Sequence, residues 1–290
     1  MSKITYTGPL AYNNGVGVMK KADFRISASG ISRFFSHTNA WWRENLMGEA
    51  GFVSSTASVL GTCVHYVSEV FAKTGKFTDQ NKQEIEDYII AHTTVNYTDY
   101  NEEVDGDIIR VQYKIMAQNV VNEYLVDNKP TQVEPFVAEE ILPGIFAGGS
   151  IDAIAGDVIC DYKTTSLTKL PDTIKFDYRL QLLTYAWIMR KKGVTINRIR
   201  LIYVNRDKPG AISEKTGKQL KSYPSEVKVI TESITDQDFH YIEGIIMMIA
   251  HSVQRWNKTP EDRYLLAQDW RLKSGQPAQV PGDNMFTKQG

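Results

Sequence analysis

Cysteine is scarce in this sequence, with two among 290 residues. A disulfide-stapled scaffold is therefore excluded, and the few Cys and His residues do not show the spacing of a zinc site. Cys63 and Cys160 both lie in apolar stretches, so we expect buried free thiols. No apolar run has the length of a membrane span and no signal peptide is recognisable, so we expect a cytoplasmic protein without a membrane partner.

An excess of charge of one sign is also lacking, because 33 Lys and Arg stand against 34 Asp and Glu. The net charge of −1 argues against a protein that coats nucleic acid broadly, although a local basic groove stays compatible with it. The G-x-x-x-x-G-K-[ST] string of nucleotide-binding loops is absent, so no nucleotide cofactor is expected. A hydrophobic content of 42 % is enough for a sizeable core, in one large domain or a domain with an appended lobe.

The most informative stretch that is present is AGGSIDAIAGDVICDYK, residues 147–163. Its second half predicts a strand, in which side chains alternate between faces, so Asp161 and Lys163 point the same way. Residues 145–155 are also strand-like, and the Ala-Gly-Asp that follows predicts a hairpin turn. In that hairpin Asp152 and Asp161 face each other across the ladder.

Two facing carboxylates repel each other, which raises one pKa or recruits a cation. A hard divalent ion prefers such oxygen ligands, and a lysine beside it would steady an anionic transition state or help to deprotonate a water. The pattern therefore indicates a site for hydrolysis of phosphodiesters. The alternative is that Asp-x-Lys is an ordinary surface ion pair.

Four pieces of sequence together resemble the RecB-like branch of the PD-(D/E)xK nuclease superfamily. They appear in the order of that family: GTCVH with His65, GSID with Asp152, DYK with Asp161 and Lys163, and QLLTY with Gln181 and Tyr185.

The resemblance implies an α/β fold, a restriction-endonuclease-like mixed β-sheet core flanked by helices, with an N-terminal helical lobe. Residues 1–130 would form the mainly helical lobe, 131–260 the nuclease core and 261–290 a C-terminal extension.

The resemblance also implies roles for the motif residues. Mg²⁺ or Mn²⁺ would be bound by Asp152, Asp161, the main-chain carbonyl of Tyr162 and His65. Lys163 would assist the water that acts as the nucleophile. Gln181 and Tyr185 would bind the DNA backbone or orient the lysine. Some members of the branch hold an iron–sulfur cluster through four cysteines, which this chain lacks.

A glutamate is usual in the family near residues 131–141, and Glu139 and Glu140 both qualify. The period of a strand forbids both from facing the site, and Glu140 is slightly preferred. Alternatively, both are solvated residues at a strand edge.

Five further residues are candidates for contact with nucleic acid. Thr164, Thr165 and Arg179 could bind phosphate. Trp41 and Trp42 could stack on bases, although such a pair is more often part of a core.

The remaining pattern predicts helices over residues 55–75, 79–95, 107–127 and 235–257, and a further helix that contains Gln181 and Tyr185 and ends at about residue 192. It also predicts strands over residues 198–205 and within SEVKVITESIT, residues 225–235. Residues 1–27 are expected to be peripheral. Residues 190–221 are dense in Lys and Arg, which indicates either a DNA track or a solvated face.

The predicted function is a metal-dependent DNA exonuclease of replication, recombination, repair or phage DNA metabolism, in the host cytoplasm if it is phage-encoded. Its partners would be linear DNA ends and a recombination, single-strand-binding or annealing protein. A flap or structure-specific endonuclease is the first alternative. A binding protein with a decayed nuclease site is the second, and a chance motif in an unrelated α/β domain is the third.

Overall fold

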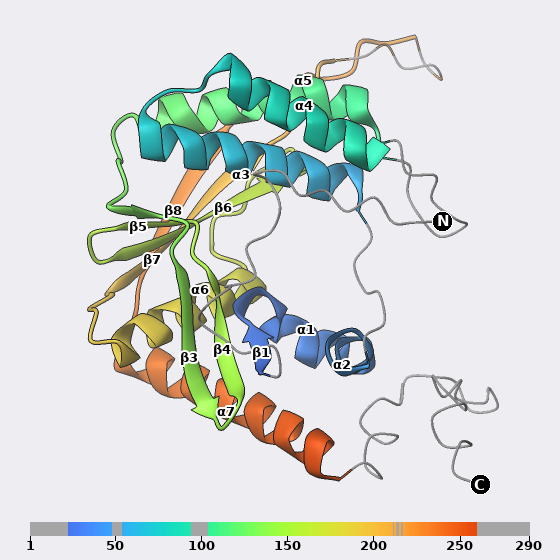
Figure 1. The fold of residues 1–290 in the computed structure, drawn as a ribbon. Coiled ribbons are helices and arrows are strands. Elements are labelled where there is room, and N and C mark those ends of the chain that lie inside the picture. The colour runs from blue at the N-terminus through green and yellow to red at the C-terminus, as the bar shows by residue number, and fades with distance from the viewer. Residues whose placement is uncertain are drawn as a thin grey trace, which may run out of the picture.

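The computed structural model describes residues 23–47, 54–93, 104–210, 212, 215 and 217–259. Within them a five-stranded β-sheet lies between two groups of helices, and a three-stranded sheet packs with one of these groups (Figure 1). The predicted C-terminal extension, 261–290, lies outside the described residues. The strands are β1 (Phe24–Ser27), β2 (Gln132–Val133), β3 (Phe136–Leu142), β4 (Ile145–Ser150), β5 (Ala153–Ala155), β6 (Val158–Thr165), β7 (Arg198–Asn205) and β8 (Val227–Ser233).

The helices follow the predicted pattern closely. Ser55 caps the third helix through a capping box, and Gly75 ends it with a left-handed φ of 69°. A short π-helical turn, Val121–Leu125, extends the fifth helix. The α-helices are α1 (Ile31–Ser36), α2 (Thr38–Leu46), α3 (Thr56–Thr74), α4 (Asp79–Thr93), α5 (Gly106–Val120), α6 (Phe176–Lys191) and α7 (Asp236–Lys258).

The larger sheet has the order β2-β5-β6-β7-β8, in which β6 and β7 are parallel and the other pairs are antiparallel. The smaller sheet has the order β1-β4-β3. The predicted continuous strand over 145–155 is wrong, because the chain leaves one sheet at Ser150 and joins the other at Ala153. The strand-like residue pattern runs unbroken across this change of sheet, so the sequence carries no local sign of it.

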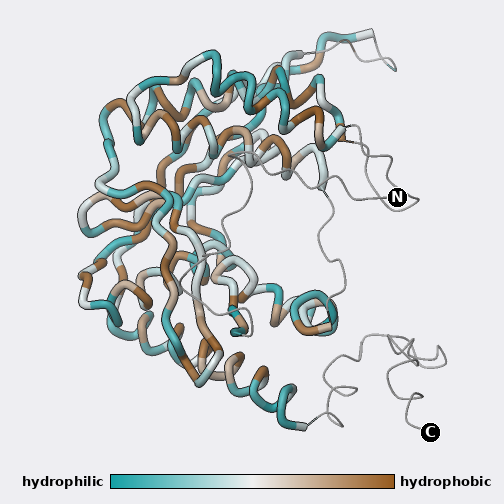
Figure 2. The backbone as a smooth tube through the Cα atoms, viewed as in Figure 1, coloured by the Kyte–Doolittle hydropathy of each residue, from teal (hydrophilic) through white to brown (hydrophobic). Residues whose placement is uncertain are grey.

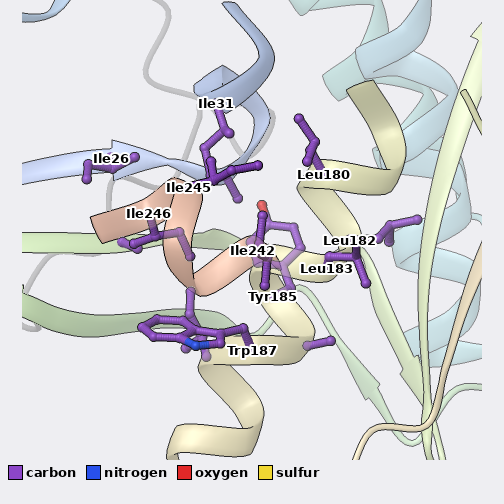
Figure 3. Packing of buried hydrophobic residues seen from close by; sticks show 14 of the residues in the cluster. Ile26, Ile31, Leu180, Leu182, Leu183, Tyr185, Trp187, Ile242, Ile245 and Ile246 are labelled. Atoms are coloured by element: carbon purple, nitrogen blue, oxygen red, sulfur yellow. The ribbon is translucent and has the colours of Figure 1, made fainter. Parts of the chain in front are cut away.

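Each face of the larger sheet packs against its own helices. On one face β6 and β7 contribute Ile159 and Leu201 to a core with α1, α2, α6 and α7. Leucines of α6 meet isoleucines of α7 in this core (Figure 3). On the other face Cys160 and Ile202 pack against α3, α4 and α5. Brown hydrophobic stretches accordingly gather along the strands, and teal ones on the outer helix surfaces (Figure 2).

Two further expectations from the sequence concern which residues are buried. The described end of the stretch predicted to be peripheral is β1, which pairs with β4 and buries Ile26, so that prediction is wrong for residues 24–27. The predicted burial of Cys63 and Cys160 is confirmed. None of the helices in the described ranges combines the length and the apolar character needed to span a membrane.

Candidate active site

The two faces of β6 carry different parts of the candidate site. Asp161 and Lys163 share the face covered by α6, as their spacing predicts, and Tyr162 points to the face covered by α3. Lys163 Nζ lies 2.9 Å from Asp161 Oδ1 and 2.7 Å from Oδ2. The Asp161 residue is 2 % exposed, so this ion pair is largely removed from water. Such a pair is unlike the exposed surface ion pair that Asp-x-Lys often forms.

Two side chains of α6 contact this ion pair. Gln181 Nε2 donates to Asp161 Oδ1 at 3.0 Å, so the amide orients the aspartate and not the lysine. One turn earlier, the ring of Tyr178 lies under Lys163, with the ammonium 5.2 Å from the ring centroid. Tyr178 is absent from the predicted site, although its spacing of three from Gln181 places both on one helix face.

Tyr185, one turn beyond Gln181, meets the smaller sheet. A Cβ built on Gly149 would lie 2.8 Å from the Tyr185 hydroxyl, and one on Gly148 would lie 2.5 Å from the Val137 carbonyl. The Gly-Gly pair is therefore needed for close approach. Tyr185 is buried and docks α6 against β4.

Asp152 lies in the link between β4 and β5, opposite Asp161 when the β5–β6 register is continued. Its Oδ2 accepts a hydrogen bond from the Tyr162 main-chain N–H at 2.9 Å and lies 3.3 Å from His65 Nδ1. The His65 ring, on α3, also meets the edge of the Tyr162 ring, with centroids 5.9 Å apart. The structure thus brings His65, Asp152, Asp161 and Lys163 together.

Glu134 joins this cluster and was not predicted from the sequence. Its main-chain N–H donates to the Asp152 carbonyl at 3.1 Å, and its φ of 54° is unusual for a residue with a side chain. Such backbone strain often occurs at functional sites. The only local signal is a glutamate before Pro135, at the start of the stretch where the family glutamate was expected.

The two glutamates chosen from the sequence point elsewhere. Glu139 pairs with Lys192 at 3.6 Å, and Glu140 accepts a hydrogen bond from the Gly144 N–H at 2.9 Å. Both lie on β3 in the smaller sheet, so the expectation that one of them faces the site is corrected. Strand spacing excluded one of them but does not identify which strand approaches the site.

Three of the residues proposed to contact nucleic acid have structural partners. Trp41 and Trp42 are 2 % and 0 % exposed, and Trp42 stacks on Trp256 at 4.9 Å, so a base-stacking platform is wrong. Arg179 binds Glu232 at 3.1 Å and Asp238 at 2.9 Å, which commits its guanidinium to holding α6 against β8 and α7.

Thr164 and Thr165 end β6 beside the cluster. The hydroxyl of Thr165 accepts a hydrogen bond from the Leu167 N–H at 3.2 Å. A Cβ on Gly61 of α3 would lie 3.2 Å from the Thr164 hydroxyl, so α3 passes close to this end of the strand.

The cluster carries an excess of negative charge. Burial raises the pKa of Glu134 to about 8, and Asp152 and Glu69 add to the rise. Burial also raises the pKa of Asp161, although Lys163 offsets part of this rise. Burial alone would lower the pKa of Lys163, but Asp161 and Asp152 outweigh it, so the lysine keeps its proton at neutral pH.

The oxygen atoms of Asp161, Asp152 and Tyr162 are the candidate ligands for a divalent cation. Asp161 Oδ2 is buried and has no hydrogen bond in the part of the chain that the structure describes, only its ion pair with Lys163. No three His, Cys, Asp or Glu side chains in that part already converge on one point that could hold an ion. A main-chain carbonyl would add a further oxygen ligand to the side chains. The N–H and C=O of one strand residue point to the same side, so the Tyr162 carbonyl points toward Asp152. With that carbonyl, the oxygen donors fit a hard cation.

Comparisons with known proteins were made at the level of family, sequence and structure. The profile of the PD-(D/E)XK nuclease superfamily matches residues 25–261. No curated protein sequence matches significantly. A structure from Eubacterium rectale that carries a provisional exonuclease assignment is similar in fold, with a TM-score of 0.50, 16 % identity, and coverage of 82 % of each chain. An alkaline exonuclease from Laribacter hongkongensis, LHK-Exo, matches with a TM-score of 0.34 and 10 % identity over 69 % of this chain and 91 % of its own.

Proposed function

Because this chain belongs to the PD-(D/E)XK nuclease superfamily, we propose that it is a metal-dependent DNA exonuclease of the RecB-like branch. One observation carries the proposal. All the motif residues except Tyr185, although far apart in the sequence, form one contact network. In it Gln181 of α6 holds the Asp161–Lys163 pair, and Asp152 lies beside His65 and accepts from the Tyr162 N–H. A protein with a decayed site would not be expected to retain every member of this network.

Asp152, Asp161 and the Tyr162 carbonyl would hold Mg²⁺ or Mn²⁺, with His65 as a further ligand. Histidine ligation slightly favours Mn²⁺. When bound, the cation would polarise the scissile phosphate and lower the pKa of a water. Burial first, and then the carboxylates of Asp152 and Glu69, raise the pKa of Glu134, and a cation bound here would offset the repulsion between these carboxylates.

The residues of the chain itself would position and stabilise the reacting groups. Lys163 keeps its proton, so Nζ would donate to a phosphate oxygen whose charge grows in the transition state. Gln181 and the Tyr162 N–H fix the carboxylates before the substrate arrives, which lowers the cost of organising the site.

The test uses end-labelled linear DNA and circular DNA, each single- and double-stranded, with Mg²⁺, Mn²⁺ or EDTA. We expect degradation of linear DNA only, dependent on metal, and a loss of about 10²–10³-fold in Lys163→Ala. Lys258→Ala, an exposed lysine at the end of α7, is the matched control.

Two outcomes would contradict parts of the proposal. Cleavage of circular DNA would favour the flap or structure-specific endonuclease. An absence of cleavage with every substrate and metal would contradict the catalytic assignment and would favour a DNA- or partner-binding protein.

A further inference from the structure

The connection between β7 and β8 is far longer than the two strands require. They are antiparallel neighbours, with Val204 opposite Val227 at the open end of the ladder. Two to five residues usually join such strands, and much longer connections are usually functional. Here residues 206–226, which we name the β7–β8 arm, intervene.

The arm is a built element with a ladder of its own. Lys208 and Tyr223 exchange two main-chain hydrogen bonds of 2.8 Å, and Ile212 bridges to Gln219. A Cβ on Gly210 would lie 2.4 Å from the Leu220 carbonyl, so glycine is needed for the two segments to pack this closely. The described residues of the arm between Lys208 and Ile212 and between Gln219 and Tyr223 thus form a two-stranded ribbon.

The base of the arm is fixed beside the catalytic strand. The Gln112 side chain donates to the Asp207 carbonyl and accepts from the Asp207 N–H, both at 2.9 Å. Asn119 donates to the Ser225 carbonyl at 3.0 Å. Lys208 Nζ donates at 2.6 Å to the carbonyl of Ser166, the residue directly after β6. The arm therefore leaves the sheet next to the end of the strand that carries Asp161 and Lys163, and runs past α5 (Figure 1).

Cationic and apolar side chains are exposed along this ribbon and at its tip. Gln219 pairs with Ile212, and neighbours along a strand alternate, so Leu220 points to the face opposite that of Ile212 and Lys221. Ile212 is 68 % exposed and Leu220 51 % exposed. Lys215, Lys218 and Lys221 are also exposed. Over residues 206–226 five Lys or Arg stand against three Asp or Glu, in a chain with a net charge of −1.

We propose that the β7–β8 arm binds the duplex part of the DNA substrate, with the ribbon in the major groove. The proposal rests on the proposed nuclease function and specifies its substrate as DNA with a duplex behind the end that is cut. A two-stranded ribbon fits the major groove. Exposed lysines along the ribbon and at its tip suit a groove, because phosphates line its walls.

The reach of the arm sets which substrates it affects. A strand advances about 3.3 Å per residue, so Lys215 can lie up to roughly 40 Å from the level of Lys163, which is about a dozen base pairs of duplex. Substrates much shorter than this bypass the tip of the arm. Long duplexes engage it.

The test compares K215A/K218A/K221A with the control K82A/K129A/K258A, which removes the same charge from exposed lysines outside the arm. Binding to a duplex of about 30 base pairs is measured in EDTA over a range of salt. We expect at least about 10-fold weaker binding for the arm variant and a salt slope shallower by about 2–3. Cleavage of a single strand of about six nucleotides should match wild type, which also shows that the variant is folded.

A second variant, I212S/L220S, separates apolar contact from charge, and it should weaken duplex binding without changing the salt slope. Unchanged duplex affinity and slope in the triple variant would overturn the proposal. A change of oligomeric state in sedimentation, with DNA affinity intact, would assign the arm to a second copy of the chain and would also overturn it. If wild type cleaves nothing, the nuclease function fails, while binding in EDTA still decides the role of the arm.

Discussion

Strand β6 presents two faces whose polar groups are held in different ways. Toward α6, Asp161 is buried and Lys163 is half-buried, and Gln181 and Tyr178 contact this pair. Toward α3, His65 reaches Asp152 from an open position, with 28 % of its side chain exposed against 4 % for Asp161. The fold holds the groups of the closed side in place, and the proposed cation and phosphate would enter from the open side.

The largest expected effect comes from breaking the closed side. Asp161→Asn removes one of two carboxylates for the cation, so we expect cleavage to fall by about 10³-fold or more. The shape is conserved, but Lys163 loses the nearest carboxylate of its ion pair, so the melting temperature should fall by a few degrees. Cleavage rates and thermal melts in EDTA check both statements. A variant that keeps substantial activity would show that Asp161 does not bind the cation.

On the open side the effect should be smaller and dependent on metal concentration. His65→Ala should lower activity by about 10–100-fold at limiting Mn²⁺, and excess Mn²⁺ should restore part of it. Titration of activity with Mn²⁺ measures this shift. His92→Ala is the control, because His92 lies on α4 against the Tyr88 carbonyl. An equal loss at every metal concentration would remove His65 from the ligand set.

A milder change on the closed side tests how Lys163 is positioned. Tyr178→Leu removes the ring below the ammonium, and we expect kcat to fall by about 3–10-fold with KM unchanged. Tyr178→Phe keeps the ring face and should retain wild-type kcat. If Phe and Leu behave alike, the ring is not positioning the lysine.

The smallest effect is on stability and depends on pH. The pKa of Glu134 is raised in the folded protein, so its protonated form favours folding. That contribution is complete below the unfolded pKa and is lost as the pH rises toward about 8. In EDTA, Glu134→Gln should therefore melt a few degrees above wild type at alkaline pH and close to it in acid.

The sequence predicted best the site residues whose placement depends on the period of a single strand or helix. The period of a strand places Asp161 and Lys163 on one face. The family resemblance singles out Gln181 and Tyr185, and the period of a helix places these two on one face, as the structure has them. Tyr178 obeys the helical period as well and could have been included.

The errors concern contacts between residues distant in the chain. Glu134 approaches Asp152 only through a strained turn and the pairing of β2 with β5. Arg179 finds its carboxylates more than 50 residues later, in Glu232 and Asp238. A single sequence shows that Trp42 is aromatic, but not that Trp256 will cover it. Periodicity tells which way a side chain points and leaves open what it meets.

Gly149 touches none of the chemistry, yet it sets a dimension of the site. The Tyr185 hydroxyl rests where a methyl group on residue 149 would stand. Alanine there would push α6 outward, and a helix transmits such a displacement to its neighbouring turns, which carry Gln181 and Tyr178. The spacing between α6 and β6 thus depends on the absence of a Cβ atom at residue 149. Residues that do not tolerate substitution therefore occur also in the smaller sheet, which supplies no reacting group.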